Sequence, residues 1–144
     1  RQDGADPRQV DSYLKDSYDE FFMKSKAIAM SRRYEHGIVV CPVKGMTLTR
    51  SMMSQVADAI LGIADVEAAF VLADDTDRET AISARSNGHV NVQVIMEKMD
   101  GGGHMTAAAM QRERCDLDEL QAELLQTIEA YFKEGENDES HSEK

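Results

Sequence analysis

The segment Gly101-Gly102-Gly103-His104 holds residues well suited to binding an anion. Three consecutive glycines cost backbone entropy, and glycine lets the main chain approach a ligand closely. We expect a loop here and a new helix from Thr106. The free N–H groups of that helix, together with His104 as a hydrogen-bond donor, would form a phosphate site. The alternative is a flexible glycine turn closed by a capping histidine.

A second candidate is the segment Ser83-Ala84-Arg85-Ser86, at the end of an expected strand. Strand alternation places Ser83 and Arg85 on one face and Ala84 on the other. An arginine at the end of an otherwise apolar strand can clamp a phosphate, because its guanidinium donates several hydrogen bonds. Taken alone, Arg85 is better explained as a surface residue paired with one of the many carboxylates.

The next loop carries polar side chains that have simpler explanations than ligand binding. Asn91 precedes apolar residues at helical spacing and is best interpreted as the N-cap of that helix. His89 is best interpreted as an exposed loop residue. The acidic cluster at 74–77 is typical of a solvated hairpin turn rather than of a cation site.

The motifs of a complete hydrolase are absent from this sequence. It contains no Asp-His-His triplet, no HExxH, no Walker loop and no GxSxG. A two-metal hydrolase needs several Asp and His ligands, which the chain does not display. Cys41 and Cys115 occur without a CxxC or a Cys/His cluster, so we expect reduced thiols rather than a disulfide or a zinc site.

Apolar patterning indicates the elements that position these residues. The pattern of residues 1–33 predicts two helices, the first beginning at Asp6-Pro7. A short β-branched run predicts a strand at 38–43, and helical spacing predicts a helix at 49–62. Strands are expected at 66–73 and 80–86, and the short polar turn between them predicts an antiparallel hairpin.

The second half of the chain has three further segments with helical character. One follows Asn91, one is the short run 106–110 after the glycines, and one begins at Asp116. The last has an apolar stripe made of Leu117, Leu120, Leu124, Ile128 and Phe132. Because strands and helices alternate, we predict an α/β fold with a mixed β-sheet and flanking helices. Residues 135–144 lack apolar side chains and are predicted to be a disordered acidic tail.

Length and charge limit the classes of function. The 144 residues suit one domain, or one domain with a tail. The 27 acidic and 16 basic residues give a net charge of −11, which argues against a general nucleic-acid coat protein. No stretch approaches the ~18 apolar residues of a membrane span, and we expect no signal peptide. Since the chain opens with Arg1, we expect it to be a piece of a longer protein.

Residues 82–111, which contain ISARS and NVQVIMEKMDGGGHMTAAAMQ, resemble the DHH-associated (DHHA) domain of the DHH phosphodiesterase superfamily. The combination of SARS, NVQVIMEKM and GGGH is most similar to the GdpP-type cyclic-di-AMP phosphodiesterases. GADPRQV resembles the helix that follows the DHH domain in those proteins. The resemblance implies linker helices at 1–33, after a DHH domain that this chain lacks, and a DHHA substrate-binding domain at 34–134.

The resemblance implies a two-domain phosphodiesterase whose DHH domain holds two manganese ions, while the DHHA domain closes over the cleft and grips the nucleotide. It implies that cyclic di-AMP is hydrolysed to pApA and that this chain holds neither a metal nor a catalytic residue. Position by position, it implies a substrate site lined by Gly101, Gly102, Gly103, His104, Arg85 and Ser86, with Asn91 at the rim.

Two alternatives remain open at this stage. The chain could be the substrate-binding domain of a nanoRNase or RecJ-like exonuclease, or a nucleotide-sensing module with no catalytic function. The expected partners are a cyclic dinucleotide or short oligonucleotide and the DHH domain of the same chain, and a homodimer is left open. GdpP-type relatives are usually anchored by N-terminal helices. The resemblance therefore implies a cytoplasmic domain, without membrane contact of its own, in a membrane-anchored protein.

Overall fold

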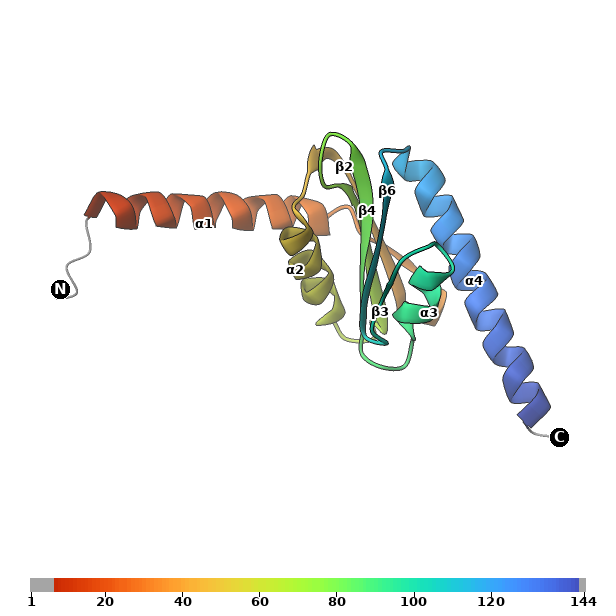
Figure 1. Cartoon of the computed structure of the whole chain (residues 1–144). Helices are drawn as coiled ribbons and strands as arrows, with labels where there is room; N and C mark the ends of the chain where they lie inside the picture. Colours follow the sequence, from red (N-terminus) through yellow and green to blue (C-terminus); the bar gives the residue numbers. More distant parts are fainter. Residues whose placement is uncertain (1–6, 143–144) are drawn as a thin grey trace.

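A computed structural model describes the backbone of residues 7–142 and the side chains of residues 17–135, and its centre is a six-stranded sheet (Figure 1). The strand order is β1-β2-β3-β4-β6-β5. Strands β2 and β3 are parallel, and all other neighbours are antiparallel. The bounds are β1 Arg32–Tyr34, β2 Ile38–Thr47, β3 Ala68–Asp74, β4 Glu79–Ser86, β5 Gly102–Gly103 and β6 Ala107–Glu113. The predicted mixed α/β sheet is confirmed.

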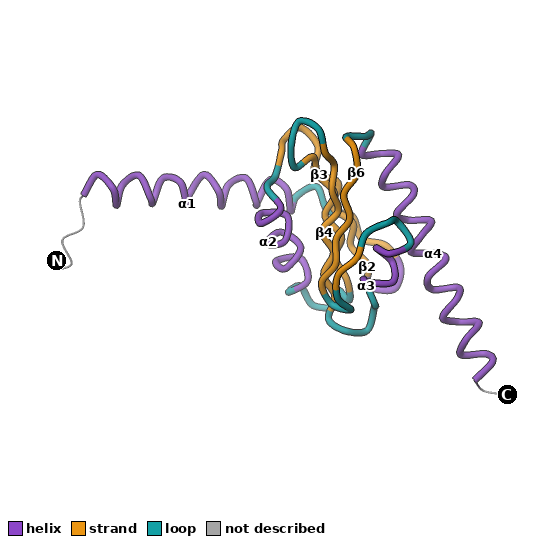
Figure 2. The backbone as a smooth tube through the Cα atoms, in the orientation of Figure 1, coloured by secondary structure: helices purple, strands orange, loops and turns teal. Residues whose placement is uncertain are grey.

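Helices lie on both faces of this sheet (Figures 1 and 2). They are α1 Pro7–Ile28, α2 Arg50–Leu61, α3 Val92–Glu97 and α4 Leu117–Ser142, with a short 3-10 turn at Glu35–Gly37. Helix α2 and the C-terminal end of α1 cover one face, and α3 and α4 cover the other. None of the helices in the described part of the chain is long and apolar enough to span a bilayer.

Each face of the sheet has its own hydrophobic core. In β3, Phe70 and Leu72 point toward α3 and α4, while Val71 and Ala69 point toward α1 and α2. Because both faces are covered, β3 is apolar at successive positions instead of alternating apolar with polar residues. This explains why the segment appears in the sequence as a continuous apolar run.

The elements around α2 and the β3–β4 hairpin match the sequence predictions. Helix α2 begins after Thr49, whose side chain accepts a hydrogen bond from the Met52 N–H at 3.1 Å. The hairpin is antiparallel and pairs Val71 with Ser83. Through this pairing, Ser83 and Arg85 of β4 lie next to α2, and both line the candidate site described below.

The predicted helix at 106–110 is wrong, because residues 107–110 belong to strand β6 and Thr106 lies in the turn before it. Alanine favours helices, but here the segment pairs with β4 on one side and with β5 on the other. Ala108 and Met110 are buried toward α3 and α4, whereas Ala107 and Ala109 face the opposite side. Pairing on both edges and burial of alternate residues outweigh the local propensity.

Both ends of the chain also differ from expectation. A single helix, α1, begins at Pro7 as predicted but continues to Ile28, and strand β1 follows where no strand was predicted. At the other end, α4 continues to Ser142. Residues 135–142 are therefore helical, whereas a disordered tail was predicted at 135–144. A helix already formed can propagate through polar residues, because each added residue gains a backbone hydrogen bond without needing a core contact. Asp6 and residues 143–144 lie outside the described residues.

Candidate functional site

A pocket of about 240 Å³ opens on the α2 side of the sheet, over strands β4, β6 and β5. Its lining comes from α2 and these three strands: Arg50, Ser54, Ser83, Arg85, Gly102, Gly103, Ala107, Ala108 and Ala109. The structure therefore brings together Arg85, Gly102 and Gly103, three of the residues singled out in the sequence. They are joined by the α2 residues Arg50 and Ser54, which were not predicted.

Two of the three consecutive glycines are required by close packing against β6. A Cβ at Gly101 would lie 2.3 Å from the carbonyl oxygen of Ala109. A Cβ at Gly103, where φ is +143°, would lie 2.5 Å from the Cα of Ala108. No heavy atom lies within 4 Å of the Cβ position at Gly102, so this residue borders open space. Of the three glycines, Gly102 alone is not required by packing within the chain.

The predicted cradle of free helix N–H groups is not formed. No helix starts after the glycines, because β6 follows them. The Gly101 N–H donates to the Met96 carbonyl at 2.8 Å, at the end of α3, and the His104 N–H donates to the Ala107 carbonyl at 2.7 Å. These two amides are thus occupied within the chain, and the charged groups of the pocket are guanidinium groups rather than a helix terminus.

Arg85 extends from β4 along the wall of the pocket beside α2. Its side chain is 23% exposed, and its Nε lies 3.5 Å from Oδ1 of Asp58 on α2. One Nη1 hydrogen donates to the Ala84 carbonyl at 2.8 Å. The surface ion pair considered from the sequence is therefore present, and the same guanidinium also lines the pocket. Since guanidinium carries five N–H donors, donors remain for a ligand.

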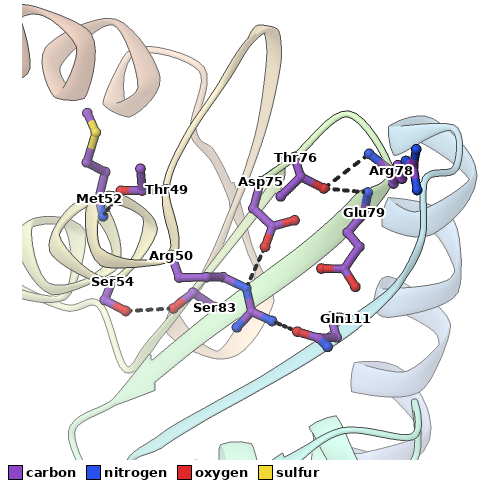
Figure 3. Close-up of polar contacts among 10 residues, drawn as sticks. All are labelled: Thr49, Arg50, Met52, Ser54, Asp75, Thr76, Arg78, Glu79, Ser83 and Gln111. Carbon is purple, nitrogen blue, oxygen red and sulfur yellow. Dashed lines mark hydrogen bonds and ion pairs between the residues drawn. The ribbon is translucent and has the colours of Figure 1, made fainter.

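Ser54 and Ser83 join α2 to β4 at the floor of the pocket. Their hydroxyl oxygens are 3.2 Å apart, and Ser83 is buried (Figure 3). Ser83 lies on the same face of β4 as Arg85, as strand alternation predicted. The contact holds the helix close to the strand and adds polar oxygens beside the arginine.

Arg50, at the first turn of α2, reaches across β4 at the edge of the pocket (Figure 3). Its Nε donates to Oδ2 of Asp75 at 3.0 Å, and an Nη2 hydrogen donates to Oε1 of Gln111 on β6. Arg50 was missed because it is 35 residues before Arg85 in a segment with no motif. The one available signal was a basic residue at the start of a helix, where acidic residues are favoured.

Of the residues predicted to bind substrate, Gly101, His104, Ser86 and Asn91 do not line the pocket. His104 is exposed, and its backbone exchanges hydrogen bonds with Ala107 to form the tight turn between β5 and β6. Ser86 is buried, where its hydroxyl donates to the Val90 carbonyl at 2.6 Å and accepts from the Gly88 N–H at 2.9 Å. Ser86 therefore shapes the 87–90 loop within this structure.

Asn91 is the N-cap of α3, which confirms that prediction. Its side chain accepts a hydrogen bond from the Val94 N–H at 3.2 Å, and its own N–H donates to the Tyr131 hydroxyl on α4. His89 is exposed, as expected, and its Nδ1 lies 2.6 Å from Glu67. Hydrogen bonds from His89 and Asn87 lower the pKa of the Glu67 carboxyl.

The chemistry available in the pocket is binding. Its lining offers two guanidinium groups, two hydroxyls and small residues, but no carboxylate, imidazole or thiol that could activate water. In the part of the chain that the structure describes, no group of three or more His, Cys, Asp or Glu side chains could hold a metal ion. The arrangement therefore suits an anion with several oxygen acceptors.

The sequence from residue 24 to residue 134 matches the family model of the DHHA1 domain. The chain is 35% identical over 138 residues to the cyclic-di-AMP phosphodiesterase GdpP of Bacillus subtilis, covering 94% of this chain and 21% of that relative. It is 37% identical over 136 residues to GdpP of Geobacillus thermodenitrificans, with the same coverage. It is 35% identical over 131 residues to the cyclic-di-AMP phosphodiesterase PdeA of Listeria monocytogenes, covering 90% and 20%. The chain thus spans about a fifth of the length of these curated relatives.

Solved structures share the fold at low sequence identity. An exopolyphosphatase-related protein from Bacteroides fragilis aligns with a TM-score of 0.57 and 16% identity, covering 80% of this chain and 34% of the other. The pGpG-specific phosphodiesterase PggH of Vibrio cholerae aligns with a TM-score of 0.56 and 17% identity, covering 77% and 39%. The family match and the fold agree with the resemblance found in residues 82–111, and this chain belongs to the DHHA1 domain family.

Proposed function

We propose that this domain binds the phosphate groups of the substrate for a phosphodiesterase that hydrolyses cyclic di-AMP to pApA. The observation that carries the proposal is the pocket in which Arg85, Gly102 and Gly103 meet, with no carboxylate, imidazole or thiol among its lining residues. Relatives at 35% to 37% identity are named cyclic-di-AMP phosphodiesterases, which supports this choice of substrate.

The shape of the pocket suits a phosphodiester. Gly102 leaves open space at β5, and Ala107 and Ala109 on β6 add only small side chains to the lining. A phosphate could therefore lie close to the main chain while its oxygens accept hydrogen bonds from Arg85. Charged donors that surround a phosphodiester orient it and stabilise the negative charge that builds up on its oxygens during hydrolysis.

The metal centre belongs, in this proposal, to a DHH domain that precedes residue 1 in a longer protein. The described residues do not fit the two manganese ions expected for the family, since no suitable cluster of ligands exists among them. The contribution of this chain is to bind and orient the substrate. We propose that α1 is the linker to that domain: it projects from the sheet and leaves Tyr18, Phe21 and Phe22 exposed (Figure 1).

We also propose that the longer protein is membrane-anchored, with this domain on the cytoplasmic side. Two phytoplasma relatives are named as fusions of a membrane protein with ribosomal subunit bL9, and these names support the proposal.

Substitution of Arg85 tests the binding function. The change Arg85→Gln removes a charged donor from the pocket, and we expect the affinity for cyclic di-AMP to fall by about 10-fold or more, the usual effect of losing a hydrogen bond to a charged group. The measurement is an NMR titration of the 144-residue chain, which detects weak binding. Thermal unfolding checks that the variant is folded.

The matched control is Arg78→Gln, which removes the same charge from an exposed turn outside the pocket. We expect this control to bind like the wild-type chain. Equal losses of affinity in both variants would show that only the overall charge of the chain matters.

Tighter binding of a short linear RNA than of cyclic di-AMP would instead assign the domain to an oligonucleotide-degrading enzyme.

A further inference from the structure

Arg50 is fixed in place by contacts from two different strands. The ion pair from its Nε to Asp75 spans 3.0 Å, and Gln111 on β6 accepts from its Nη2 (Figure 3). Asp75 directly follows β3 and Gln111 lies on β6, so the guanidinium of Arg50 connects these two parts of the sheet across the intervening strand β4. Its side chain is still 40% exposed, which leaves one side of the guanidinium open to solvent.

Asp75 has a single cationic partner among the described residues. Its side chain is only 8% exposed, and its second oxygen, Oδ1, is buried without a hydrogen-bond partner in this part of the chain. A buried carboxylate is costly unless a charge compensates it, so Asp75 strongly favours the position of Arg50 seen here. Asp75 is therefore suited to hold the guanidinium at one place and orientation.

Arg50 and Arg85 line the same pocket but reach it from different elements. Arg85 comes from β4 and is largely buried, and Arg50 comes from the first turn of α2 and lies at the rim. A guanidinium has five N–H donors, and the contacts of Arg50 with Asp75 and Gln111 use two of them. Two guanidinium groups beside one small cavity, in a chain whose net charge is −11, point to a ligand with more than one anionic group.

We propose that Arg50, positioned by Asp75, binds a second phosphate of the ligand whose first phosphate lies at Arg85 and Gly102. This inference rests on the proposed function and refines it, because it makes the domain selective for dinucleotides that carry two phosphates. Arg85 contacts the phosphate that bridges the two nucleosides, at the buried end of the pocket. Arg50 contacts the other phosphate, at the exposed rim.

The test compares two linear dinucleotides that differ by one phosphate: ApA has only the bridging phosphate, and pApA adds a terminal one. We expect the wild-type chain to bind pApA about 10-fold more tightly than ApA in NMR titrations, since a guanidinium–phosphate contact is a strong hydrogen bond. Arg50→Gln should remove most of this preference while affinity for ApA changes by less than about 2-fold. Arg85→Gln should weaken binding of both ligands.

Two further variants separate ligand binding from a purely structural role. Arg50→Lys keeps the positive charge beside Asp75 but lacks the planar guanidinium, so we expect normal thermal unfolding and a reduced preference for pApA. Asp75→Asn frees the guanidinium and should reduce the same preference without affecting ApA. The control Arg78→Gln should keep the wild-type preference, which accounts for the overall change in charge.

The outcomes distinguish this inference from the function on which it rests. If wild-type protein binds ApA and pApA equally, or if both Arg50 variants keep the preference, Arg50 only fastens α2 to the hairpin and the inference is overturned. In those cases the function proposed for Arg85 still stands. If the wild-type chain binds neither dinucleotide nor cyclic di-AMP, both proposals fail together.

Discussion

Gly102 is the residue at which packing and ligand binding are most clearly separated. Its neighbours Gly101 and Gly103 cannot carry a side chain, because a Cβ would overlap the backbone of β6. Gly102 faces no such obstacle, since the space beside it is open. A bare backbone next to a pocket with two guanidinium groups is what close approach by a phosphate requires. Packing against β6 therefore accounts for Gly101 and Gly103, whereas for Gly102 we propose close approach by a ligand phosphate.

Alanine substitutions at Gly102 and Gly103 should affect different properties, namely ligand binding for Gly102 and stability for Gly103. Gly103→Ala places a Cβ against Ala108 at a strained φ, so we expect the free energy of unfolding to fall by about 2 kcal/mol or more. Gly102→Ala should leave the free energy of unfolding within about 0.5 kcal/mol of wild type and weaken binding of cyclic di-AMP. Urea unfolding and the NMR titration measure the two effects. Normal ligand binding by Gly102→Ala would contradict the close approach.

At the scale of elements, strand β6 shows that local sequence patterns are not sufficient to predict secondary structure. Helix α2 and the β3–β4 hairpin were predictable because their apolar spacing and capping residues are local signals. The run Thr106–Met110 carries a local helical signal as well, but its structure is decided by two neighbouring strands, β4 and β5. Propensity is a weak guide when a segment can pair on both edges.

The candidate site was predictable to the extent that its residues carry local signals. Arg85 and the glycines stand out by type and position, and the sheet brings them together through β4, β6 and β5. Arg50 and Ser54 reach the pocket only because α2 crosses the sheet beside β4, a feature of the tertiary structure. The resemblance implied that Ser86 lines the substrate site together with Arg85, but the alternation of β4 turns its hydroxyl toward the loop that follows.

The contact between α4 and β6 predicts a pH-dependent contribution to stability. Glu123 accepts two hydrogen bonds from Arg112, at 2.8 and 3.0 Å, and these lower the pKa of its carboxyl. The stabilisation is therefore complete above the unfolded-state pKa and is lost as the pH falls through the folded-state pKa. Because both side chains are partly exposed, we expect Glu123→Gln to cost about 0.5 to 1 kcal/mol near pH 7.

Urea unfolding of wild type and Glu123→Gln across the acid range checks this expectation. The difference between the two free energies of unfolding should shrink as Glu123 of the wild-type chain becomes protonated. Glu129→Gln is the control, since Glu129 pairs with Lys133 within the exposed surface of the same helix. A difference that stays constant down to acidic pH would mean that the ion pair does not fasten α4 to the sheet.

At the scale of the whole molecule, the function we propose separates substrate binding from the metal-dependent step of hydrolysis. The pocket supplies cationic donors and has no carboxylate, imidazole or thiol in its lining, and no cluster of three or more possible metal ligands exists among the described residues. We therefore expect the purified 144-residue chain to bind cyclic di-AMP but not to hydrolyse it when manganese is added. Chromatographic detection of pApA is the measurement. Manganese-dependent product formation that persists in the Arg85→Gln variant and disappears on further purification would identify a contaminating enzyme.

A sheet with independent cores on its two sides also affects how such a domain can change during evolution. The pocket lies entirely on the α2 side, whereas Phe70, Met96 and Leu124 pack on the other. Substitutions at rim positions such as Arg50 can therefore alter which ligands are accepted while the opposite layer keeps the scaffold intact. The same scaffold can therefore acquire a different ligand preference through substitutions on the surface of α2, without any change in the core beneath α3 and α4.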